Sequence, residues 1–95
     1  MDKLSEQQRV EALERLSDWQ EQGGAISRTF HLKDFARAID FVNAVAEMAE
    51  DVGHHPDIDI RYNKVTITLT THSAGGLTRS DVELAAAIET IAASA

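Results

Sequence analysis

Apolar and polar residues alternate with a helical period over the first part of the chain. Ser5 and Gln8 have the form of a capping box, a pattern typical of a helix start. The apolar residues that follow recur at helical spacing: Val10, Leu13 and Leu16. The pattern predicts a first helix from about Glu6 to Ser17.

The period changes to two after a double glycine, Gly23-Gly24. Ile26, Phe30 and Leu32 share one period-2 face, so Ala25 to Leu32 is predicted to be a strand. Arg28 lies on the same face. The segment before the glycines, Trp19 to Gln22, is a candidate partner strand in a hairpin.

A helical stripe then runs for about five turns beyond Asp34. It consists of Phe35, Ala38, Ile39, Val42, Val45, Ala46 and Ala49. Gly53 stands where a left-handed residue would end this helix. The last turns carry Glu47, Glu50 and Asp51, although the helix macrodipole disfavours anions there. These carboxylates therefore need another explanation.

Two more strands and a helix complete the pattern. Ile58 and Ile60 alternate with charged residues, and Val65, Ile67 and Leu69 alternate with threonines. The short Tyr62-Asn63-Lys64 segment between them predicts an antiparallel hairpin. Thr78 is a good N-cap and Asp81 falls at N3, opening a last helix that continues to about Ala93.

The predicted order is α-β-β-α-β-β-α. We expect one α+β domain over residues 1–95, with three helices packed on one face of a four-stranded antiparallel sheet. The opposite, threonine-rich face would be left uncovered, and an edge strand would need protection or a partner. A homo-oligomer is one solution for so small a core.

Composition narrows the chemistry. The chain has no cysteine, which excludes disulfides, thiolate metal sites and cysteine nucleophiles. Nine Lys and Arg against sixteen Asp and Glu give a net charge of −7, which disfavours direct binding to nucleic acid or to anionic membranes. No stretch approaches the ~20 apolar residues of a membrane span, and no signal peptide is apparent. We expect a soluble cytoplasmic protein.

Three of the four histidines stand at the ends of predicted elements. His54 and His55 lie between the long helix and the third strand, and His72 lies just past the fourth strand. Because the third and fourth strands are antiparallel, all three imidazoles should converge on one rim of the sheet. Glu50 and Asp81 are placed to bring two carboxylates to the same rim.

These residues form a spaced pattern: Glu50, three residues, His54-His55-Pro56, five residues, Tyr62, nine residues, His72, eight residues, Asp81. The pattern resembles the signature of the pterin-4a-carbinolamine dehydratases. The resemblance extends from about Ala25 to the C-terminus. Many members of that family carry an aromatic residue soon after the proline, where this chain has Asp57-Ile58.

The resemblance implies loss of water from a 4a-hydroxytetrahydropterin to give quinonoid dihydropterin, a step in tetrahydrobiopterin recycling, with no metal or organic cofactor. Imidazole titrates near neutrality and suits both proton transfers. Our hypothesis makes His54, oriented by Glu50, one proton-transfer group, and His72 the other across the pterin ring. His55 would hold and polarise the pterin ring. Asp81 would either orient His72 or cap the last predicted helix. The substrate-binding residues would be His54, His55, Pro56, Thr71, His72, Ser73 and Ala74.

Two other functions fit the same residues. A metal site could use His54, His55, His72 and Glu50, but adjacent histidines point to different sides of an extended turn, which makes joint ligation awkward. A non-catalytic dimerisation or regulatory module on the same fold is the other alternative. The resemblance also implies a homodimer formed through the sheet or a homotetramer formed through helices.

Overall fold

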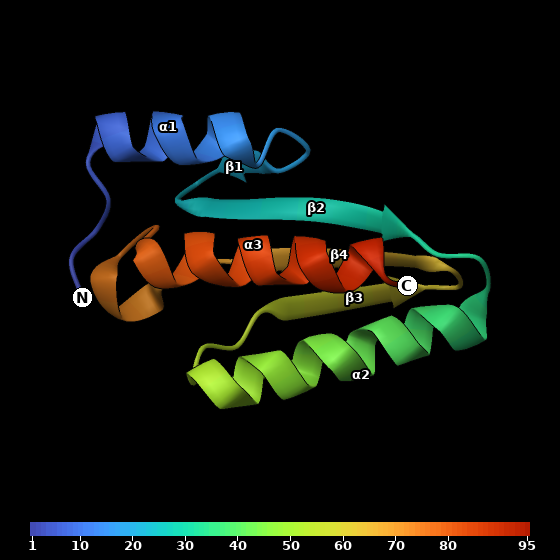
Figure 1. Ribbon diagram of the computed structural model, residues 1–95. Helices are drawn as coiled ribbons and strands as arrows, with labels where there is room; N and C mark the ends of the chain where they lie inside the picture. The colour runs from blue at the N-terminus through green and yellow to red at the C-terminus, as the bar shows by residue number, and fades with distance from the viewer.

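A four-stranded antiparallel sheet with the strand order β1-β2-β4-β3 forms one layer of the protein (Figure 1). The computed structural model describes all 95 residues. Its elements are α1 (Glu6–Arg15), β1 (Gln20–Gln22), β2 (Ala25–His31), α2 (Phe35–Val52), β3 (Asp57–Arg61), β4 (Lys64–Leu69), a short 3-10 helix η1 (His72–Ala74) and α3 (Arg79–Ala93). The predicted order and the α+β class are confirmed, whereas η1 was not predicted and α1 ends before Ser17.

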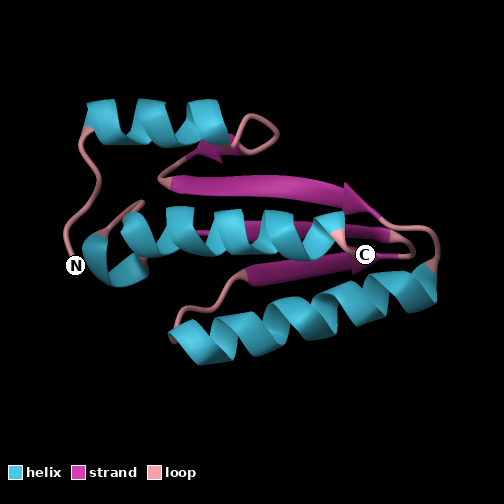
Figure 2. Ribbon diagram, viewed as in Figure 1, coloured by secondary structure: helices cyan, strands magenta, loops and turns pink.

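The three helices form a second layer on one side of the sheet, with α3 across its middle (Figure 2). Val65, Ile67 and Leu69 of β4 are fully buried beneath them. The threonines that alternate with these residues lie on the other, uncovered face. The period-2 pattern of the sequence therefore sets which face of the sheet carries the core.

Aromatic side chains connect the two layers. Phe30 of β2 lies between Trp19, at 6.0 Å between ring centroids, and Phe41 of α2, at 4.9 Å. All three are buried. Phe35 also belongs to the predicted helical stripe, but it is 51% exposed because it opens α2 at the edge of the core.

Arg28 points toward the helices although it is charged. Its guanidinium pairs with Glu89 of α3 and lies 4.4 Å from the centroid of the Phe30 ring. Trp19 donates a 2.9 Å hydrogen bond to the same Glu89 carboxylate. These contacts join α3 to the first hairpin, which explains how a strand tolerates arginine on its inner face.

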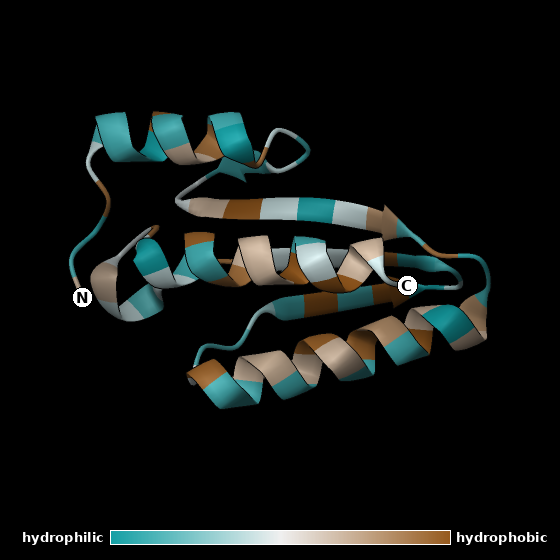
Figure 3. Cartoon of the chain, viewed as in Figure 1, coloured by the Kyte–Doolittle hydropathy of each residue, from teal (hydrophilic) through white to brown (hydrophobic).

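Helix α1 is mostly hydrophilic and lies over the first hairpin (Figure 3). Ser5 and Gln8 form the predicted capping box at its start. The candidate strand before the double glycine is also confirmed, since β1 pairs with β2. None of the three helices has the length and apolar composition required to cross a bilayer.

Candidate active site

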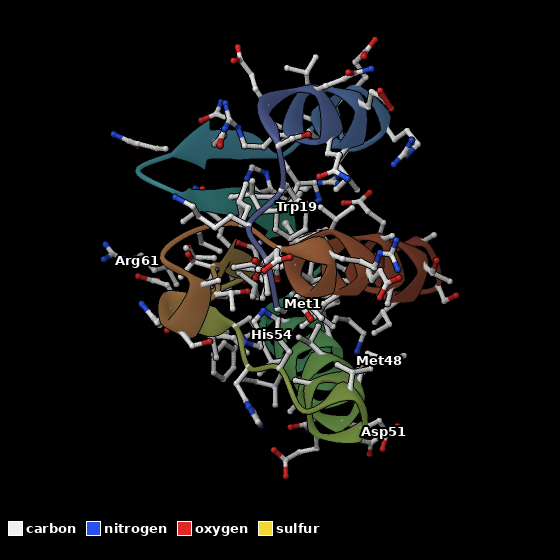
Figure 4. All side chains as sticks on the ribbon, turned by 90° about the vertical axis from the view of Figure 1, so that its left-hand side faces the viewer. Met1, Trp19, Met48, Asp51, His54 and Arg61 are labelled. Atoms are coloured by element: carbon white, nitrogen blue, oxygen red, sulfur yellow. The ribbon has the colours of Figure 1, made fainter.

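The chain brings the histidine-bearing segments to one rim of the sheet. Asp57 at the start of β3 pairs with Thr68 near the end of β4, so the segments that precede β3 and follow β4 lie together. Gly53 ends α2 in the left-handed conformation, with φ of 68°, and turns the chain toward the rim. The predicted meeting of the α2–β3 turn with the end of β4 is thus confirmed. Figure 4 views this rim and shows His54 between the ends of α2 and α3.

Asp81 is the buried centre of a hydrogen-bond network at this rim. It is 0% exposed, although it is a carboxylate. Its Oδ1 accepts from His54 Nε2 at 2.6 Å, and its Oδ2 accepts from the Thr71 hydroxyl at 2.8 Å and the Thr78 amide at 2.9 Å. An ionised carboxylate can only accept, so Nε2 of His54 carries a proton and Nδ1 is left for other partners.

The second carboxylate pairs with the second histidine. Glu50 Oε2 lies 2.5 Å from His55 Nε2, and both side chains are largely exposed. This pair explains why an anion stands in the last turn of α2, where the macrodipole opposes it.

The predicted partner of His54 was therefore wrong, whereas one of the two roles predicted for Asp81, the helix cap, is confirmed. Glu50 was expected to orient His54, and Asp81 was expected to orient His72 or to cap α3. In the structure Glu50 contacts His55, while Asp81 both caps α3 and binds His54. The reason is that the side chains of these adjacent histidines leave the turn in different directions: His54 turns inward and is 17% exposed, whereas His55 faces solvent and is 64% exposed.

His72 lines a cavity of about 390 Å³ at the same rim. Small-molecule pockets commonly have volumes of about 300–1,000 Å³, so this cavity is large enough for a ligand. The other residues that line it are Gly23, Ala25, Asp57, Thr68, Thr70, Gly75 and Gly76. The His72 ring makes no hydrogen bond with the protein, so both its nitrogens are free to contact a ligand.

His54 lines a different and smaller cavity of about 130 Å³ between α2 and α3, below the usual range for small-molecule pockets. The expected arrangement, in which His54 and His72 face each other across the pterin ring, stays a prediction. Asp81 of α3 holds Nε2 of His54 and also contacts Thr71, the residue that precedes His72.

Two other features of the structure bear on the site. The largest cavity, about 650 Å³, lies at the opposite end of α2 and α3, and none of the four histidines lines it. No group of three histidine, aspartate or glutamate side chains is arranged to hold a metal ion. What the rim does offer is imidazole paired with carboxylate, which suits proton transfer.

Sequence reasoning missed Asp57 and Thr68 as site residues. Both lie on the uncovered face of the sheet and share the cavity of His72. The sequence did contain the information needed to find them, because the strand alternation and the hairpin register place Asp57 and Thr68 side by side at the histidine rim.

Comparison with known proteins identifies the family. The family model for pterin 4 alpha carbinolamine dehydratase matches residues 2–91. A curated relative from Chloroflexus aurantiacus, named as a candidate pterin-4-alpha-carbinolamine dehydratase, is 55% identical over 91 residues, which cover 96% of this chain and 98% of that protein. A relative of the same name from Nocardia farcinica is 54% identical over 89 residues, 94% of each chain.

Solved structures agree with these relatives. The crystal structure of a transcriptional coactivator/pterin dehydratase from Brucella melitensis matches with a TM-score of 0.92 and 40% identity, covering 96% of this chain and 99% of that one. A pterin dehydratase-like protein described as a RuBisCO assembly factor in the alpha-carboxysome matches with a TM-score of 0.66 and 25% identity, covering 78% and 86%. The chain therefore belongs to the pterin-4-alpha-carbinolamine dehydratase family.

Proposed function

We propose that this chain is a cytoplasmic, single-domain enzyme that converts a 4a-hydroxytetrahydropterin to quinonoid dihydropterin during tetrahydrobiopterin recycling. In this reaction the C4a–O bond breaks, the hydroxyl group leaves as water after protonation, and N5 loses its proton as a C4a–N5 double bond forms. The reaction therefore needs one group that donates a proton and one that accepts a proton. Histidine suits both roles near neutral pH.

One observation carries this proposal: a ligand-sized cavity is lined by an unengaged imidazole, His72, beside two histidines that are each held by a carboxylate. We assign one proton transfer to His72, which has access to the cavity. We assign the other to His54, whose Nδ1 is free while Asp81 holds Nε2. His55 with Glu50 would polarise the ring, and Pro56 and the backbone of Thr71 to Ala74 would line the substrate.

The activity is tested by the decay rate of a 4a-carbinolamine generated in the assay. Wild-type protein should accelerate this decay, and His72→Ala and His54→Ala should each lower the catalysed rate by about 10²- to 10⁴-fold, as expected for loss of a proton-transfer group. His31→Ala is the matched control, because His31 pairs with Lys64 at the opposite end of the strands. Decay at the uncatalysed rate with wild-type protein would contradict the proposal.

A non-catalytic interaction module is the second candidate. The names of two structural relatives describe a transcriptional coactivator and an assembly factor, which shows that members of this fold have been linked to roles besides catalysis. The uncovered threonine face and the edge strand would supply a surface for such a partner. Absence of catalysis in the assay above would favour this second function.

We also propose that the protein is a homo-oligomer that includes a pairing of β3 with β3 of a second copy. β3 is one edge of the sheet and has five residues, whereas β1 at the other edge has three. Ile60 on β3 is 38% exposed, and Tyr62 next to it is 70% exposed. An unpaired edge that carries exposed apolar side chains is a template for addition of another strand.

A further inference from the structure

Asp57 stands out among the groups that line the His72 cavity. It lies on the first residue of β3, and its carboxylate takes part in no hydrogen bond or ion pair of the structure. The next acidic residue on the same face, Asp59, is engaged with Arg61 at 3.1 Å. Asp57 is thus a free acceptor in a cavity of ligand size.

A donor of hydrogen bonds lies beside it. Thr68 is the cross-strand partner of Asp57, so the two side chains emerge next to each other on the uncovered face. The Thr68 hydroxyl makes no hydrogen bond within the protein, whereas Thr70, just past the end of β4, donates to the Gly24 carbonyl at 2.7 Å. The cavity wall therefore presents two acceptor oxygens followed by one hydroxyl donor.

This order of groups matches the pyrimidine edge of a pterin. That edge carries a 2-amino group, the N3–H and the C4 carbonyl, which are two donors followed by one acceptor. A carboxylate accepts from two adjacent N–H groups at once, and such charge-assisted bidentate pairs are stronger than bonds between neutral groups. The hydroxyl beside it can donate to the carbonyl oxygen.

We propose that Asp57 is the substrate-recognition residue that binds the 2-amino and N3–H groups of the pterin, with Thr68 donating to O4. This inference rests on the proposed function and extends it, since it fixes which edge of the ring enters the cavity. The pyrimidine edge then lies against the β3–β4 face. The C4a–N5 side of the ring is left for His72.

The substitution Asp57→Asn tests this recognition because it replaces one acceptor oxygen with an NH₂ donor at almost the same size. Binding of 7,8-dihydropterin, measured by calorimetry, should weaken by roughly 10- to 100-fold, the effect of removing a hydrogen bond to a charged group. A dihydrolumazine, in which a carbonyl replaces the 2-amino group, should bind the variant as tightly as wild type or more tightly. A residue with a merely structural role would weaken both ligands equally.

Asp59→Asn is the matched control, since it changes the same residue type on the same face of the same strand. It should leave the affinity of both ligands unchanged. The inference is overturned if Asp57→Asn keeps the preference of wild type for pterin over lumazine, or if wild type binds neither ligand. These binding experiments need no turnover, so a failed decay assay would remove the proposed reaction while a switch of preference would still establish ring recognition by Asp57.

Discussion

A buried carboxylate connects three separate parts of the chain at the rim. Asp81 accepts hydrogen bonds from His54 in the α2–β3 turn, from Thr71 after β4 and from Thr78 at the start of α3. Because Thr71 donates its proton to Asp81, the Thr78 hydroxyl must donate in the 2.8 Å contact between the two threonines. A single side chain thus fixes the direction of the His54 ring and the position of the loop that carries His72.

Asp81→Asn should affect both stability and activity. The amide keeps one acceptor and places an NH₂ group against donors, so we expect the free energy of unfolding to fall by about 2–3 kcal/mol. The catalysed dehydration should slow by about 10²- to 10⁴-fold, because His54 loses the group that orients it. Urea unfolding and the carbinolamine decay assay measure the two effects.

Ile88→Ala separates these two consequences. Ile88 is fully buried on the same helix, and its truncation should cost about 2–5 kcal/mol without touching the network. This variant should retain near wild-type activity under conditions in which it is folded. If Ile88→Ala slowed the reaction as much as Asp81→Asn does, the effect of Asp81 would be one of stability alone.

At the scale of the elements, the end of α2 determines where both adjacent histidines point. Gly53 has φ of 68°, and its amide donates to Ala49, as expected for a glycine that ends a helix. The His54 amide also donates to Ala49, at 3.1 Å. The left-handed residue reverses the chain at once, so His54 faces α3 while His55 remains beside the last turn of α2.

Replacement of Gly53 tests this local conformation. A Cβ at this position would meet no atom within 4 Å, so Gly53→Ala should destabilise only through backbone strain, by about 1–2 kcal/mol. Gly53→Asn should cost less, since asparagine tolerates the left-handed region better than alanine does. Urea unfolding of both variants measures the difference, and equal losses would contradict a strain origin.

The sequence predicted the elements well because their hydrophobic periods differ and their boundaries carry strong signals, such as the Ser5 cap and Gly53. It predicted the meeting of the histidine segments because antiparallel pairing brings the start of β3 to the end of β4. It could not predict which carboxylate meets which histidine, since that depends on dihedral angles within the α2–β3 turn. Phe35 shows the same limit, because a helical stripe does not reveal where the core beneath it ends.

At the scale of the whole molecule, a two-layer fold leaves without cover one face of the sheet and its longer edge strand, β3. The helices bury the apolar face, and the hydroxyl groups of Thr29 and Thr66 bond to each other on the open face at 2.8 Å. That face can remain solvated, because its polar groups are satisfied by each other and by water. The backbone N–H and C=O groups on the outer edge of β3 have no neighbouring strand in this chain with which to form hydrogen bonds.

Ile60→Lys tests whether β3 pairs with a second copy. A lysine at an edge strand is a common device against strand addition, and here it would place a charge where the pairing buries an apolar side chain. Wild-type protein should be a dimer or tetramer by light scattering coupled to size exclusion, and the variant should have half the mass of wild type.

Val10→Lys is the control, because Val10 is 51% exposed on α1, and it should leave the mass unchanged. A monomeric wild type, or an unchanged mass for Ile60→Lys, would show that the exposed edge is protected by solvent and by its flanking charges, Asp59 and Arg61, instead of by a partner.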